Sequence, residues 1–238
     1  MSGIDILTRI DIKNRKVLFI VKWEDYISEI ELIKKQNNVE YDLYTVIANV
    51  LRERKTFKNT SLRFVGERKR TASAKEKVFW ALRGFPDFVI LGKDYEPAEN
   101  DTDRKLVYGA VEAKAVGRPI LESKNDQLQF IGHLLWFGKV IYTNGLDWYF
   151  YENTWVVDEE EITRMQEISY NKYAKKPKNV EEDKEINAYL NRFKIADLKC
   201  KPFILYKEHN GQKIWDIKEW EKLIKYLDKY DLVSSVKQ

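Results

Sequence analysis

The chain has little cysteine, little histidine and no long apolar run. Its 238 residues include one cysteine, Cys200, and two histidines, His133 and His209. A single thiol excludes intramolecular disulfides, zinc ribbons and cysteine-ligated iron–sulfur clusters, and two histidines leave little for a histidine metal site. No apolar stretch approaches the roughly 18 residues of a membrane-spanning helix, and the first residues lack the basic and apolar segments of a secretory signal. We therefore expect a cytoplasmic protein with no membrane partner.

Charge is plentiful but unevenly distributed. The chain has 42 lysines and arginines against 38 aspartates and glutamates, a formal charge of +4. Residues 52–77 contain ten basic and three acidic residues, so this stretch alone carries +7. Clustered positive charge attracts a polyphosphate by releasing its counterions, although a solvated helix end and loop has the same composition. The candidate phosphate contacts in this stretch are Arg52, Arg54, Lys55, Arg63, Arg68, Lys69 and Arg70.

Hydrophobic patterning predicts a mixed α/β core. Apolar residues at helical spacing predict helices over residues 42–54 and 126–137, the second ending at Gly138. An Asn144-Gly145 pair between two apolar runs is typical of a hairpin turn. Runs rich in β-branched and aromatic residues predict strands over residues 16–23, 85–91, 106–116, 139–143 and 147–152. The order β–β–α–β–β indicates one mixed sheet flanked by helices.

Beyond Trp155 the pattern is polar and mostly helical. Residues 203–217 predict a further hairpin around Asn210-Gly211, and residues 218–230 predict a final helix. The length suits one large domain. We therefore expect a single domain over residues 1–238, with a core of about residues 40–152 and a largely helical C-terminal extension of about residues 153–238.

Two predicted strands carry charges where a buried strand is normally apolar. Asp87 lies in the first, and Glu112 and Lys114 lie in the second. Because strand side chains alternate, Glu112 and Lys114 share a face, and pairing of the two strands would bring Asp87 to Glu112. Buried carboxylates are costly without a partner, and hard oxygen ligands suit Mg²⁺ or Mn²⁺. Lys114 could then activate water or stabilise charge on a phosphate, whereas a structural Glu–Lys pair at a sheet edge is the alternative.

In their order and spacing these residues resemble the PD-(D/E)XK nuclease superfamily. The similarity rests on Pro86-Asp87, on Glu112-Ala113-Lys114, on the glutamine-bearing helix that follows, and on the hairpin Thr143-Asn144-Gly145 with Trp148. Within the superfamily, the chain is most similar to the nuclease domain of type I restriction-enzyme motor subunits, over about residues 40–152. The resemblance implies a restriction-endonuclease-like fold, a role in restriction–modification, and Mg²⁺-dependent cleavage of DNA by an activated water.

The resemblance also implies roles for individual residues. Asp87 and Glu112 would be metal ligands, the carbonyl of Ala113 a third ligand, and Lys114 the catalytic lysine. Members of the superfamily often carry a glutamate near the metal on the first helix, and Glu40 is the candidate here.

Members often carry, on the helix after the lysine strand, a glutamine followed four residues later by a tyrosine. In this chain Gln127 is followed at that spacing by Ile131, and Gln129 by His133, so the tyrosine is absent. We favour Gln129, with His133, as the catalytic glutamine over Gln127.

The leading hypothesis is a Mg²⁺- or Mn²⁺-dependent DNA endonuclease whose basic stretch holds phosphates. The chain has no Gly-x-x-x-x-Gly-Lys-Ser/Thr loop, so we expect no nucleotide cofactor. A non-catalytic nucleic-acid-binding or assembly protein that retains the fold is the alternative, and an enzyme acting on RNA is a weaker one. Many members of the superfamily cut duplexes as dimers, so a homodimer is a further expectation.

Overall fold

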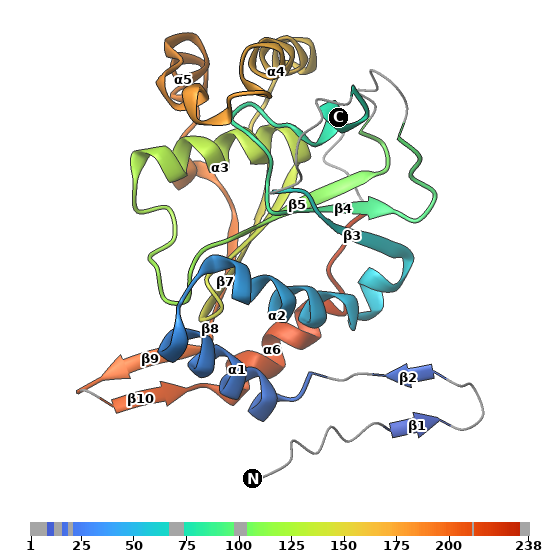
Figure 1. Cartoon of the computed structure of the whole chain (residues 1–238), viewed down its shortest axis with the longest axis vertical. Coiled ribbons are helices and arrows are strands. Elements are labelled where there is room, and N and C mark those ends of the chain that lie inside the picture. Colours follow the sequence, from blue (N-terminus) through green and yellow to red (C-terminus); the bar gives the residue numbers. More distant parts are fainter. Residues whose placement is uncertain are drawn as a thin grey trace.

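The computed structural model describes residues 9–11, 16–18, 21–66, 74–97, 104–210 and 212–233. Over these residues the chain is a mixed α/β protein in which a six-stranded sheet lies between two layers of helices (Figure 1). The helices of the described part are α1 (Trp23–Gln36), α2 (Glu40–Arg52), α3 (Lys124–Phe137), α4 (Glu159–Tyr173), α5 (Lys184–Leu190) and α6 (Ile217–Leu227). None of these helices is long and apolar enough to cross a bilayer.

The central sheet is mixed. Its strands follow the order β3-β4-β5-β6-β7-β8, and every neighbouring pair is antiparallel except β5–β6, which is parallel and joined by α3. Two small hairpins, β1–β2 and β9–β10, form separate two-stranded sheets. The strands are β1 (Arg9–Asp11), β2 (Lys16–Leu18), β3 (Thr60–Phe64), β4 (Phe88–Gly92), β5 (Val107–Ala113), β6 (Lys139–Thr143), β7 (Asp147–Glu152), β8 (Cys200–Ile204), β9 (Tyr206–His209) and β10 (Gln212–Trp215).

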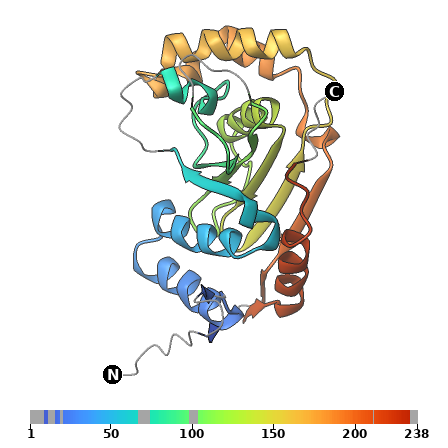
Figure 2. The same cartoon turned by 90° about the vertical axis from the view of Figure 1, so that its right-hand side faces the viewer.

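Alternation along the central strands creates two hydrophobic cores. On β4, Phe88 and Ile90 face one core, and Val89 and Leu91 face the other, because successive strand side chains point to opposite faces of a sheet. Helices α1, α2 and α6 cover the first face, and α3, α4 and α5 cover the second (Figures 1 and 2). Both faces being covered explains why β4 is apolar and buried along its whole length.

The sequence pattern predicted the centre of the fold well. The hairpin β6–β7 has the predicted bounds, and α3 ends before Gly138, whose φ of 75° suits glycine. The prediction of a strand over residues 16–23 was wrong at its end, because Trp23 begins α1. Helix α1 buries Tyr26, Ile30 and Ile33, a helical spacing that the apolar run just before it obscured.

The C-terminal part of the chain completes the sheet and is not an appendage to it. Strand β8 pairs with β7, and α6 buries Trp220, Leu223 and Leu227 in the core shared with α1 and α2. The predicted hairpin around Asn210 is present as β9–β10. The pattern did not predict β8, because its partner strand lies far away along the sequence.

Candidate functional site

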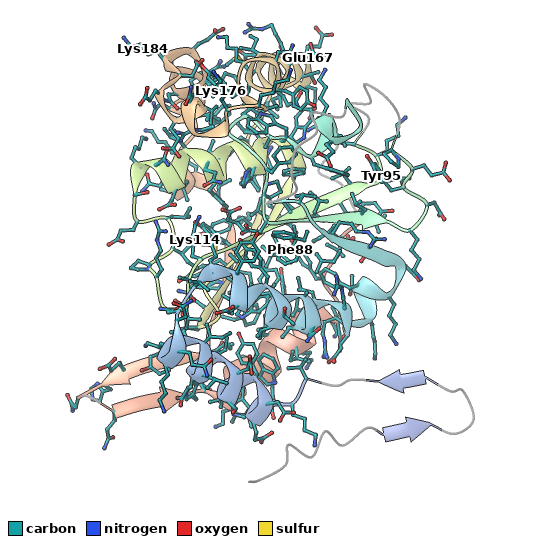
Figure 3. All side chains as sticks on the ribbon, in the orientation of Figure 1. Phe88, Tyr95, Lys114, Glu167, Lys176 and Lys184 are labelled. Atoms are coloured by element: carbon teal, nitrogen blue, oxygen red, sulfur yellow. The ribbon has the colours of Figure 1, made fainter. Side chains whose placement is uncertain are left out.

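Asp87, Glu112 and Lys114 lie together at one end of the central sheet. Strands β4 and β5 pair antiparallel with Phe88 opposite Val111, so Asp87 and Glu112 are neighbours across the pair. The Oδ2 atom of Asp87 accepts a hydrogen bond of 2.7 Å from the backbone N–H of Ala113. All three charged side chains are buried. Figure 3 shows Lys114 between α2 and α3, which reach this end of the sheet from opposite faces.

Lys114 is held by two carboxylates. Its Nζ donates to Glu112 Oε1 at 3.1 Å and lies 3.6 Å from Asp126 Oδ1. Asp126 is in the first turn of α3, where its backbone N–H donates to the hydroxyl of the N-cap residue, Ser123. Burial lowers the pKa of Lys114, but the charges of Glu112 and Glu40 raise it by more. The ammonium therefore stays protonated at neutral pH.

The hydroxyl group of Tyr44 contacts the carboxyl groups of both Glu40 and Asp87. Its hydroxyl oxygen lies 2.9 Å from Glu40 Oε1 and 2.5 Å from Asp87 Oδ1. A phenol has one proton to donate, so both contacts can be hydrogen bonds only if one carboxyl group is itself protonated. Tyr44 was not predicted from the sequence. The signal available was the spacing of four residues between Glu40 and Tyr44, which places both on one face of α2.

The carboxyl groups of this cluster are difficult to ionise together. Burial raises the pKa of Asp87 well above its usual range, and the charges of Glu112 and Glu40 raise it further. Burial also raises the pKa of Glu112 and of Glu40, although Lys114 opposes both shifts. With Asp126 and Arg118 included, four carboxyl groups face two cations. The cluster would carry a surplus of two negative charges if all were ionised.

Helix α3 supplies a buried histidine behind Glu112. The Nδ1 atom of His133 lies 3.4 Å from Glu112 Oε2, and burial, with the charge of Lys114, lowers the pKa of His133 to about 3. The imidazole is therefore neutral. Among the described residues, Oε2 of Glu112 is buried without a hydrogen-bond partner. The two glutamines differ: Gln127 donates to the carbonyl of Leu121 at 2.9 Å, whereas Gln129 is half-buried one turn from both Asp126 and His133.

The loop after Lys114 is fixed at three points. The backbone N–H of Lys114 donates to the Thr143 carbonyl at 2.9 Å. The Asn38 side chain donates to the Val116 carbonyl at 3.1 Å, and the Asn144 side chain donates to the Arg118 carbonyl at 3.0 Å. Asn144 thus joins the β6–β7 turn to this loop. The loop brings Arg118 to the rim of the cluster, where its Nη2 donates to Asp126 Oδ2 at 3.2 Å.

The predicted phosphate contacts differ in their exposure and in their partners. Arg54 is buried and paired with Glu53 at 3.2 Å, which leaves little of its charge for a ligand. Arg52 donates to the Leu62 carbonyl at 3.3 Å and is otherwise exposed, as are Lys55 and Arg63. Arg68, Lys69 and Arg70 lie outside the described residues.

The donor chemistry of the cluster suits a hard divalent cation. Asp87, Glu112 and the Ala113 carbonyl offer only oxygen, and Mg²⁺ typically binds one or two carboxylates and keeps several waters. The surplus of negative charge and the unpartnered Oε2 of Glu112 agree with such an ion. Within the described part of the chain, however, no three histidine, cysteine, aspartate or glutamate side chains are already arranged to hold a metal.

Comparison with protein-family models, with curated proteins and with solved structures found no match for this chain in any of the three.

Proposed function

We propose that this chain is a Mg²⁺- or Mn²⁺-dependent DNA endonuclease of the PD-(D/E)XK type, with a restriction-endonuclease-like arrangement of its sheet. The observation that carries the proposal is the cluster at the end of β4 and β5. There Asp87 accepts a hydrogen bond from Ala113, and Lys114 lies 3.1 Å from Glu112, all of them buried. Burying two carboxylates and a lysine costs stability, which is understandable if the group does chemistry.

Five residues of the cluster have roles in this proposal. Asp87, Glu112 and the carbonyl of Ala113 would hold the ion, which when bound supplies an activated water and neutralises charge on the phosphate. The Lys114 ammonium, protonated beside Glu112, donates to the attacking water or to a phosphate oxygen and stabilises the negative charge that develops there. Tyr44 holds Asp87 by its Oδ1 atom, and the Ala113 N–H holds Oδ2, so both ligand oxygens are oriented before the ion arrives.

DNA as the partner is supported by the charge of residues 52–77 and by the resemblance of the motifs. The same proposal includes that the protein acts in the cytoplasm, that it has a role in restriction–modification, and that it forms a homodimer. Gln129 is the remaining catalytic candidate, one turn of α3 from the two residues that contact Glu112 and Lys114.

The proposal is tested by cleavage of supercoiled plasmid with Mg²⁺ or Mn²⁺. We expect Asp87→Ala and Lys114→Ala to lower the rate by at least about 100-fold, because each removes a group that acts on the charge of the transition state. Lys172→Ala is the matched control, since this lysine pairs with Asp183 at 3.5 Å in the outer helical layer. Its rate should equal that of the parent.

Cleavage that survives both cluster substitutions would overturn the assignment of the site. A folded parent that binds DNA but never cuts it with either ion would instead support the non-catalytic binding protein.

A further inference from the structure

The two cations of the cluster have different surroundings. The Lys114 side chain is 9 % exposed and is held by Glu112 and Asp126. The Arg118 side chain is 51 % exposed and contacts Asp126. The ammonium group of Lys114 is therefore buried between two carboxylates, whereas the guanidinium group of Arg118 is half exposed to solvent.

The backbone that carries Arg118 is fixed, although its side chain is exposed. The Arg118 N–H donates to the Ala115 carbonyl at 2.9 Å, and its own carbonyl accepts from the Asn144 side chain at 3.0 Å. Asn144 is held in turn by accepting from the N–H groups of Leu146 and Asp147. A side chain that starts from a fixed backbone loses less freedom when it binds a ligand.

Asp126 occupies a position that an anionic ligand could share. Its carboxylate lies between the two cations, 3.6 Å from Lys114 Nζ and 3.2 Å from Arg118 Nη2. Carboxylate and phosphate oxygens both suit the planar fork of a guanidinium. An incoming phosphate would therefore compete with Asp126 for the arginine, and the exposed guanidinium can turn towards it while the buried ammonium stays in place.

We infer that Arg118 is a substrate-binding residue that contacts a backbone phosphate of DNA next to the bond that is cut. Asp126 holds the guanidinium at the rim of the site until the phosphate arrives. This inference rests on the proposed function, because the substrate is taken from it. It adds to the cluster a residue that binds substrate and takes no part in holding the ion.

The test measures binding without cleavage. A fluorescently labelled DNA duplex is titrated with the full chain in EDTA, at several salt concentrations, using fluorescence anisotropy. We expect Arg118→Ala to raise Kd about tenfold and to lower the slope of log Kd against log salt concentration by about one, as for the loss of one phosphate contact. Arg118→Lys keeps the charge but not the fork, and should fall between the parent and the alanine variant.

The matched control is Arg164→Ala. Its side chain is 59 % exposed and pairs with Glu185 in the outer layer, so Kd and the salt slope should not change. Asp126→Asn should act in the opposite direction from Arg118→Ala and lower Kd, because it removes the anion that competes for the arginine. Thermal melts of each variant check that the fold is retained.

The outcomes separate this inference from the proposed function. A parent that does not bind the duplex, or an Arg118→Ala variant that binds like Arg164→Ala, would overturn the role of Arg118 even if the enzyme cuts plasmid. A parent that binds through Arg118 but never cuts would leave the role of Arg118 intact and overturn the nuclease. Inorganic phosphate that displaces the duplex at concentrations well below those of sulfate would show a site for free phosphate, and would also count against the inference.

Discussion

At the scale of single residues, the cluster holds more carboxyl groups than its cations can balance. Tyr44 contacts Glu40 and Asp87 with one hydroxyl proton between them, and burial already raises the pKa of both carboxyl groups. In the absence of a divalent ion, burial and the neighbouring negative charges therefore favour the protonated forms of Asp87 and Glu40 more strongly in the folded protein than in the unfolded chain. A loss of stability of this kind is common at sites that are arranged to bind a charged ligand.

Asp87→Asn should raise the stability of the chain in EDTA. An asparagine side chain can still accept from the Ala113 N–H through its oxygen, and its amide can donate to the Tyr44 hydroxyl, so both contacts are retained without the buried charge. We expect a higher Tm for the variant at pH 7, measured by circular dichroism. Mg²⁺ should raise the Tm of the parent but not that of the variant.

The same variant has a predicted pH dependence. A carboxyl group whose pKa is raised on folding contributes most stability below its unfolded pKa of about 4, and the contribution is lost as pH rises through the folded pKa. The gain in Tm of Asp87→Asn over the parent should therefore increase from pH 5 to pH 8. His133, whose pKa falls to about 3, acts in the opposite direction but equally in both proteins. A gain that shrinks with pH would contradict the raised pKa of Asp87.

At the scale of elements, the sequence predicted those parts of the site that follow one strand. Asp87, Glu112 and Lys114 could be identified because charges interrupt apolar runs, and alternation along a strand is a local pattern. Asp126 and the contact of Tyr44 with Asp87 could not, because α2 and α3 approach the sheet from opposite faces and only their packing brings these residues to one place. The spacing of Glu40 and Tyr44 shows that both lie on one face of α2, but not that this face meets Asp87. Tertiary packing of this kind leaves no periodic signal in the sequence.

The turn between β6 and β7 offers a test at this scale. Gly145 has a φ of 81°, and a Cβ atom there would lie 2.9 Å from Ile30 Cδ1 and from Leu43 Cδ1. Gly145→Ala should therefore lower the free energy of unfolding by about 1–3 kcal/mol, through backbone strain and crowding. Chemical denaturation measures this loss.

Gly84→Ala is a useful comparison for Gly145→Ala. Gly84 also has a positive φ, 126°, but a Cβ there would meet no atom within 4 Å. Gly84 lies further from the left-handed region that other residues tolerate, whereas only Gly145 is crowded. We expect Gly145→Ala to cost more, which would show that crowding by Ile30 and Leu43 outweighs the greater backbone strain at Gly84, and a smaller loss for Gly145→Ala would contradict this.

At the scale of the whole molecule, α1 and α6 meet in one core although they lie far apart in the sequence. Tyr26 of α1 packs against Trp220 of α6 with ring centroids 4.5 Å apart. Strand β8 covers the outer edge of β7. The predicted boundary near residue 153 therefore does not divide the molecule into independent parts, and the whole should unfold in one transition.

Leu223→Ala tests that cooperativity. Leu223 is fully buried on α6, and the lost contacts and the cavity should cost about 2–5 kcal/mol. We expect one denaturation transition, shifted to lower denaturant, when tryptophan fluorescence and far-ultraviolet circular dichroism are followed together. Leu32→Ala, at a leucine that is 43 % exposed on α1, should change stability by less than about 0.5 kcal/mol. Two separate transitions in the Leu223 variant would show that α6 belongs to an independent unit.

The pairing of β8 with β7 also has a consequence for how the protein is made. Residues 153–199 separate the two strands, and a ribosome adds about 5–20 residues per second. For roughly 2–10 s, therefore, the aromatic strand β7 is complete while its partner does not yet exist. An unpaired edge of this kind readily joins another chain. Nascent copies on neighbouring ribosomes should be most prone to aggregate during this interval, and a chaperone would be most useful then.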